Sequence, residues 1–191
     1  MSVRLAPKTF GISFASFSTH VSMERLDRYK RVALECDELD FVQRFPHAFL
    51  VKRPTAAPQR QNQESPRFTF ATVTAKVDDE IFASIWQVVP VVKREGNPFP
   101  ERLSIGRATN CDLVVRLPFI SKVHAHLLLK PDGRLELVDN QASNGTYHNH
   151  RQLRPGETRP VQPGDVISLG KLSLVLFTAS GFYRLLHTEA S

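Results

Sequence analysis

Two hydrophobic patterns divide this chain of 191 residues. Between residues 23 and 45, apolar side chains recur every three or four positions, which predicts one bent helix or two short helices with one buried face. From residue 86 onward, short apolar runs alternate with turn residues, which is typical of an antiparallel β-sandwich. We therefore predict a mainly β protein with an N-terminal helical extension.

The helical part carries its own start and stop signals. Asp37 is expected to cap a second helical piece, and Pro46 ends the pattern because its ring cannot continue a helix. The apolar stripe needs a surface to cover it. Packing on the sandwich and docking of a partner helix both fit the pattern, and the sequence does not choose between them.

Eight short strands are expected in the sandwich. They cover residues 87–94, 102–106, 112–116, 123–130, 134–139, 145–148, 165–169 and 172–177. The strongest hairpin signal is Asp132-Gly133, because this dipeptide suits the tight turns that join antiparallel strands. An earlier strand is predicted at 67–77, with a short helix running to residue 85.

These patterns divide the chain into six segments. Residues 54–66 are predicted to be a linker, because they hold three prolines and no periodic apolar residues. The six segments are a disordered lead at 1–22, a helical segment at 23–53, the linker at 54–66, a strand and short helix at 67–85, the sandwich domain at 86–178 and a C-terminal tail at 179–191.

Composition indicates which class of partner the protein binds and in which cellular compartment it is found. The net charge of +6 favours an acidic partner, but Lys and Arg form no dense run, so we do not expect nucleic acid. The two cysteines lie in different segments, which predicts reduced thiols in a cytoplasmic protein. No apolar run is long enough to span a bilayer, so membrane binding is not expected.

Three polar clusters lie at predicted strand ends. They are Ile105-Gly106-Arg107, Ser121-Lys122-Val123-His124 and Ser143-Asn144-Gly145-Thr146. A sandwich gathers its loops at its ends, so distant residues can converge there. An arginine fork, a hydroxyl and a carboxamide together suit a phosphate and the peptide that carries it.

These clusters, with the later Gly164-Asp165-x-Ile167-x-Leu169-Gly170, resemble the forkhead-associated (FHA) domain in order and spacing. The resemblance covers roughly residues 86–178. It implies an eleven-stranded β-sandwich that binds phosphothreonine peptides through loops at one end.

Carried over by position, the resemblance implies two groups of residues. The phosphopeptide-binding residues would be Arg107, Ser121, Lys122, Ser143 and Asn144. The structural residues would be Gly106, His124, Gly145, Thr146, Gly164 and Asp165. One departure lies after Thr146, where Asn149-His150 replaces the usual Asn-Gly turn, so His150 must adopt a left-handed backbone conformation.

The expected function is a phosphothreonine-peptide-binding signalling adaptor. Its partner would be a threonine-phosphorylated protein, either a Ser/Thr kinase or a substrate of one. The alternative is a phosphorylation-independent interaction scaffold that uses the same fold.

Enzymatic and metal-dependent functions fit the sequence poorly. A hydrolase triad of Ser121 and His124 with Asp139 or Asp165 lacks a Gly-x-Ser-x-Gly elbow, so we expect no enzyme. The paired histidines of two predicted strands lack a Cys or carboxylate cluster, so no metal or cofactor is expected.

Overall fold

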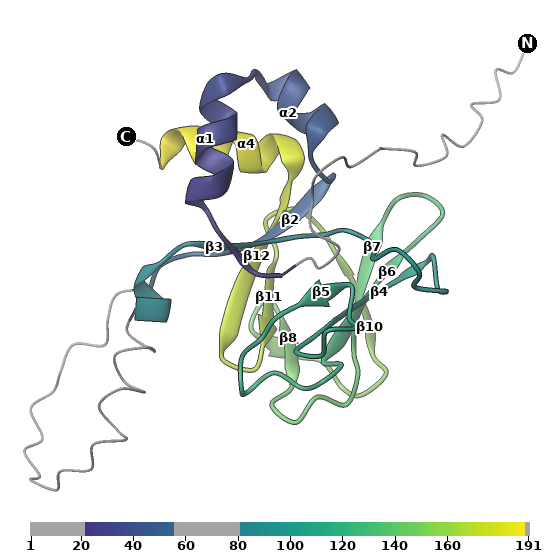
Figure 1. Ribbon diagram of the computed structural model, residues 1–191. Coiled ribbons are helices and arrows are strands. Elements are labelled where there is room, and N and C mark those ends of the chain that lie inside the picture. The colour runs from purple at the N-terminus through teal and green to yellow at the C-terminus, as the bar shows by residue number, and fades with distance from the viewer. Residues whose placement is uncertain (1–21, 56–80, 190–191) are drawn as a thin grey trace, which may run out of the picture.

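The computed structural model describes residues 22–55 and 81–189, which form a β-sandwich with a helical cap at one end (Figure 1). The predicted lead, apart from Ser22, lies outside the described residues, as do most of the linker and the strand predicted at 67–77. In the described ranges, no helix has the length and apolar character needed to cross a membrane.

Two sheets face each other in the sandwich. The first has the order β1 (Glu24–Arg25), β3 (Gln87–Pro90), β2 (Ala48–Lys52), β12 (Leu172–Thr178), β11 (Val166–Leu169), β8 (Thr146–His148) and β9 (Arg151–Gln152). The second has the order β10 (Thr158–Val161), β7 (Leu135–Asp139), β6 (Ala125–Leu129), β4 (Arg102–Gly106) and β5 (Leu113–Val114). All named strand pairs are antiparallel except β4 with β5. The predicted antiparallel sandwich is confirmed, with twelve strands among the described residues where the resemblance implied eleven.

The sandwich core follows the alternation of apolar side chains. In β6, Ala125 and Leu127 are fully buried, whereas the alternating His126 and Leu128 lie nearer the surface. Leu127 pairs in register with Leu137 of β7, and both contribute to the same core. The β6–β7 hairpin turns at Gly133, whose φ of 82° needs the freedom of glycine.

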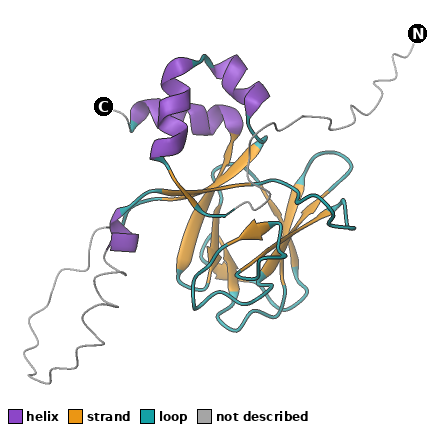
Figure 2. Ribbon diagram, viewed as in Figure 1, coloured by secondary structure: helices purple, strands orange, loops and turns teal. Residues whose placement is uncertain are grey.

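Three helices form the cap and bury an aromatic cluster (Figure 2). They are α1 (Asp27–Glu35), α2 (Glu38–Arg44) and α4 (Ala179–Thr188). Their cluster packs against the outer face of the first sheet and includes Tyr29, Phe41, Phe45, Phe49 and Phe182. Of the two possibilities for the N-terminal stripe, the structure therefore has the stripe packed on the protein's own sandwich and C-terminal helix.

The helical prediction at 23–45 corresponds to two short helices rather than one bent helix. The Asp37 carboxylate accepts a hydrogen bond from the Asp40 backbone N–H at 2.9 Å, which confirms the predicted cap. A cap in the middle of the pattern ends α1 and begins α2, so the two helices can each turn toward α4.

Two assignments at the edges of the sandwich domain were wrong. Residues 48–52 belong to the predicted helical segment but form β2, in the interior of the first sheet. Phe49 and Val51 face the cap while Leu50 faces the sandwich core, so both faces are apolar and the strand shows no alternation. The predicted C-terminal tail contains α4, which Thr178 caps by accepting from the Gly181 N–H at 3.0 Å.

Candidate functional site

The loop that carries Arg107 lies against the loop that carries Ser121. The Arg107 backbone N–H donates to the Ser121 carbonyl at 3.0 Å, and the Ala108 N–H donates to the Lys122 carbonyl at 3.1 Å. Gly106 makes this approach possible, because a Cβ there would lie 2.2 Å from the Lys122 carbonyl oxygen. Only glycine fits between these two backbones.

A third loop joins the first two at the same end of the sandwich. The Ser121 hydroxyl accepts a hydrogen bond from the Ser143 N–H at 3.2 Å, and the Asn144 amide donates to the Phe119 carbonyl at 2.7 Å. The chain thus brings together the loops that carry all five predicted binding residues. This end is the lower one in Figure 1, because β12 starts there and runs up to the cap.

The cations of these loops have no acidic partner within the described part of the chain. Arg107 and Lys122 are exposed, and their charged groups make no hydrogen bond or ion pair with any described residue. Two carboxylates lie in or next to these loops, Asp112 and Asp139, and both are buried and accept hydrogen bonds from the protein itself. The loops therefore present uncompensated positive charge to solvent.

The buried side chain of His124 links two of the loops from the interior of the sandwich. Its fully buried ring accepts the Ser121 N–H at Nδ1 over 3.1 Å, and its Nε2 lies 3.1 Å from the Gly145 carbonyl. This pair of contacts requires the neutral ring with its proton on Nε2. Burial lowers the pKa of His124, against the smaller opposing effects of the Gly145 carbonyl and Asp139, which keeps the ring in that form.

The third loop also has an internal frame. Gly145 has a φ of 70°, in the left-handed region, and its carbonyl also accepts the Gly170 N–H at 2.9 Å. The buried Thr146 hydroxyl donates to Asp139 at 2.6 Å, and the other carboxylate oxygen accepts the Ala142 N–H at 3.3 Å. These contacts set the backbone shape of the loop that carries Ser143 and Asn144.

Gly164 and Asp165 lie at the other end of β11, away from the three loops that meet at Ser121. The Asp165 carboxylate accepts from Asn149 Nδ2 at 2.8 Å and from His148 Nε2 at 2.9 Å, which ties two turns together. Asn149 and His150 have φ values of 47° and 68°, so the turn takes the left-handed conformation that this departure from the family pattern requires.

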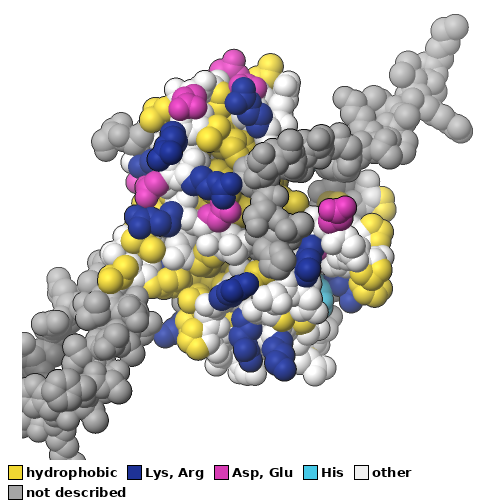
Figure 3. Space-filling model, viewed as in Figure 1, with side chains coloured by type: hydrophobic (Ala, Val, Ile, Leu, Met, Phe, Trp, Pro, Cys, Tyr) yellow, Lys and Arg dark blue, Asp and Glu magenta, His cyan; other side chains and the backbone are white. Residues whose placement is uncertain are grey.

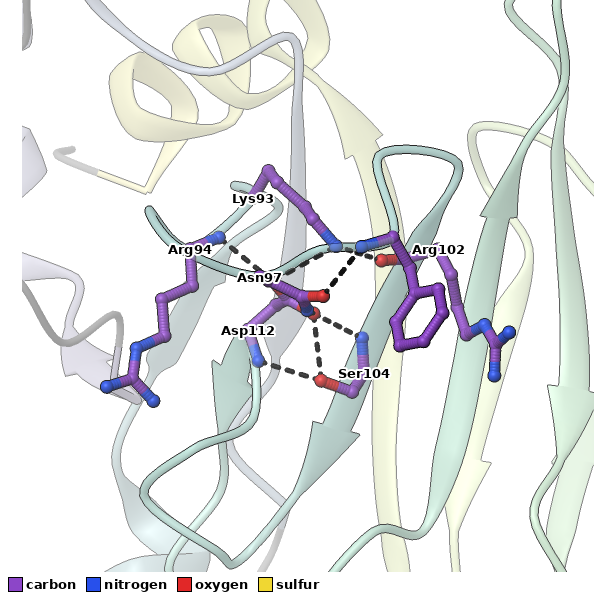
Figure 4. A network of polar contacts seen from close by, with 7 residues as sticks. Lys93, Arg94, Asn97, Arg102, Ser104 and Asp112 are labelled. Carbon is purple, nitrogen blue, oxygen red and sulfur yellow. Dashed lines mark hydrogen bonds and ion pairs between the residues drawn. The ribbon is translucent and has the colours of Figure 1, made fainter.

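A buried carboxylate supports the Arg107 loop from its far end (Figure 4). The Asp112 carboxylate accepts from the Ser104 N–H and hydroxyl at 2.7 and 2.8 Å, from Asn97 Nδ2 at 2.6 Å and from the Arg94 N–H at 2.9 Å. The Lys93 ammonium lies 3.5 Å away. Burial alone would raise the pKa of Asp112, but these donors outweigh burial and lower it.

Sequence reasoning missed this network. Arg94 also donates from its guanidinium to the Thr109 carbonyl at 2.8 Å, so residues 93–97 hold the loop that begins at Arg107. The available signal was a single carboxylate between Cys111 and Leu113 in an apolar run. A charge in such a run needs buried donors, although the sequence does not show where they come from.

Comparisons with known proteins identify the family of the sandwich. Residues 103–170 match the family model of the FHA domain. The chain is 31% identical over 122 residues to the protein FraH of Nostoc sp. (strain PCC 7120), covering 64% of this chain and 40% of that protein. It is 34% identical over 76 residues to the ABC transporter ATP-binding/permease protein Rv1747 of Mycobacterium tuberculosis, covering 40% of this chain and 8% of that protein. The chain thus spans less than half the length of these curated relatives.

Solved FHA domains are also similar. The N-terminal FHA domain of Rad53p from S. cerevisiae, solved in complex with a phosphothreonine peptide, is 21% identical with a TM-score of 0.40, covering 72% of this chain and 98% of that one. The MEK1 FHA domain is 30% identical with a TM-score of 0.38, covering 48% of this chain and 88% of that one. Because these TM-scores are low, the assignment rests on the match of residues 103–170.

Proposed function

Because residues 103–170 give this chain an FHA domain, we propose that it is a phosphothreonine-peptide-binding adaptor rather than an enzyme. It docks in the cytoplasm onto proteins that a Ser/Thr kinase has phosphorylated, or onto the kinase itself. The proposed contacts are made by Arg107, Ser121, Lys122, Ser143 and Asn144.

One observation carries the proposal. Three loops meet through the Arg107–Ser121 and Ser143–Ser121 hydrogen bonds, and the side chains of Arg107 and Lys122 have no acidic partner among the described residues. Phosphothreonine carries about −1.5 to −2 charges near pH 7, so it supplies the missing anion. Each hydrogen bond from a charged donor contributes about 1.5–3 kcal/mol, and a small set of such contacts supports a Kd in the micromolar range, roughly −8 kcal/mol.

Peptide titration tests this function. A degenerate phosphothreonine library is titrated against the wild type and Arg107→Ala, with Arg134→Ala as the control because Arg134 lies on the exposed β6–β7 turn and pairs with Asp132. We expect binding to phosphorylated peptides alone, lost in Arg107→Ala and retained in the control. Equal binding of phosphorylated and unphosphorylated peptides would contradict the proposal.

Two further variants separate ligand contacts from frame contacts. Ser121→Ala removes a hydroxyl that lies at the loop surface, so we expect weaker binding with a nearly unchanged melting temperature. His124→Ala removes a fully buried ring with two hydrogen bonds, so we expect a lower melting temperature. The opposite pattern would reverse the roles assigned to these two residues.

A second function has one observation in its favour. Leu34 and Leu39, at the turn between α1 and α2, are 69% and 68% exposed. This pair suits a phosphorylation-independent scaffold that uses the helical cap. A pull-down with and without phosphatase treatment distinguishes the two functions, because only the first loses its partner after treatment.

A further inference from the structure

A second cationic group lies beside the proposed phosphothreonine site, in the β11–β12 turn. Lys171 is exposed, and its ammonium lies 4.8 Å from the centre of the Phe119 ring. The ring attracts the cation and so favours one placement of an otherwise variable side chain. In the described part of the chain, this ammonium has no hydrogen bond or ion pair.

The Lys171–Phe119 pair adjoins the predicted ligand contact Asn144. The Phe119 carbonyl accepts the Asn144 amide at 2.7 Å. At Gly170, a Cβ would lie 3.0 Å from the Asn144 Cβ and 3.6 Å from the Phe119 ring. A peptide that binds the Asn144 side chain would therefore pass next to the ammonium of Lys171.

The charge around this pair has one sign. Arg116, in the same loop as Phe119, is exposed and makes no ion pair with any described residue. Residues 103–124, 140–145 and 170–171 contain one carboxylate, Asp112, and Asp139 immediately precedes the second range; both are buried with their own donors. Figure 3 agrees: Lys and Arg side chains occupy the lower part of the sandwich face, whereas most acidic side chains on that face lie toward the cap.

We propose that Lys171, placed by Phe119, forms a flanking subsite that selects phosphothreonine peptides with a second anionic residue beside the phosphothreonine. This inference rests on the proposed function and adds the class of peptide. A carboxylate and a second phosphate share the required chemistry, and the phosphate gains more because it carries the larger charge. The gain is electrostatic and made at the surface, so it decreases as salt is added.

Fluorescence anisotropy with matched peptides tests the subsite. Three series of phosphothreonine peptides carry Ala, Asp or phosphoserine at each flanking position in turn. For the wild type, we expect one position at which Asp lowers the Kd by about 2- to 5-fold relative to Ala, and phosphoserine lowers it further. In Lys171→Gln, the ratio of the Ala to the Asp Kd should approach one, while the Ala peptide keeps its affinity within about 2-fold.

A matched control removes one positive charge far from the loops. Arg31 is exposed on α1, in the cap at the other end of the seven-residue β12, so Arg31→Gln should leave the Asp preference intact. Phe119→Leu keeps all charges but removes the ring, and it should reduce the preference without abolishing binding.

Failure of the subsite and failure of the function give different results. If no phosphothreonine peptide binds the wild type, the proposed function is wrong. If peptides bind in an Arg107-dependent way but Ala and Asp peptides bind equally, or if Lys171→Gln keeps the preference, the subsite is wrong. A preference lost equally in Arg31→Gln would indicate an effect of net charge alone and would also overturn the subsite.

Discussion

Replacing Asp112 with Asn tests whether the buried carboxylate holds the Arg107 loop. The substitution keeps the shape of the side chain but removes its charge and turns one acceptor into a donor. The oxygen that faces Ser104 and Asn97 has three donors, and the other has the Arg94 N–H. An Asn cannot accept at both positions, so one set of donors must lose its partner.

The magnitude follows from these contacts. If the Asn amide faces Arg94, one buried N–H is left without an acceptor, which costs about 1–3 kcal/mol. The three remaining hydrogen bonds become neutral and lose about half their strength. The Lys93 ammonium, 3.5 Å away, also loses its ionic partner but keeps its hydrogen bond to the Arg102 carbonyl. Together these losses predict a decrease of about 3–5 kcal/mol in the free energy of unfolding, similar to breaking a buried ion pair.

Urea denaturation at pH 7 measures this loss, with Asp132→Asn as the control because Asp132 is an exposed carboxylate on the β6–β7 turn. The control should change stability by less than about 0.5 kcal/mol. At roughly 2–4 °C per kcal/mol for a protein of this size, the Asp112 variant should melt about 10 °C lower. Faster hydrogen exchange at residues 107–112 should accompany the loss. A decrease below about 1 kcal/mol would refute the assignment of Asp112 as the anchor of this loop.

Three further predictions concern the frame of the site and the cap. Gly106→Ala forces a Cβ to within 2.2 Å of the Lys122 carbonyl oxygen, so the melting temperature and the phosphopeptide affinity should both fall. Unchanged binding in this variant would show that the Arg107 loop and the Ser121 loop need not be in contact. Burial lowers the pKa of His124, so its contribution to stability is complete above about pH 6.5 and decreases as pH falls through the folded pKa. Urea titrations at pH 7.5 and 5.5 should show that the free energy of unfolding decreases by up to about 1.4 kcal/mol per pH unit, and by less in His124→Gln. An equal decrease in the wild type and the variant would assign the pH dependence to other groups. Phe182→Ala opens a cavity in the aromatic cluster and should lower the free energy of unfolding by about 3–5 kcal/mol. Peptide affinity, measured by anisotropy under conditions in which the variant is folded, should stay unchanged because the cap lies far from the loops.

The helical cap shows which part of the fold was hidden in the sequence. Its aromatic cluster joins residues from both ends of the described chain, such as Tyr29 and Phe182, whose rings lie 5.4 Å apart. The N-terminal stripe was visible as a periodic pattern, but α4, which forms part of the surface that covers it, lies more than a hundred residues later. The strand β2 was hidden for a related reason: both of its faces are buried, so it lacks the alternation that predicts a strand.

The order of short apolar runs and turn residues determined the antiparallel sandwich, because strand alternation and turn chemistry are local properties. The spacing of the Arg107, Ser121 and Asn144 clusters likewise identified the family in advance of the structure. The resemblance marked Gly106 and His124 as structural residues, but only the tertiary structure showed the contacts that they make, and it added the carboxylate of Asp112. The contacts of His124 with Gly145, of Asn97 with Asp112 and of Gly106 with Lys122 join separate segments of the chain, so no local pattern contains them. The placement of Lys171 over Phe119 is of the same kind.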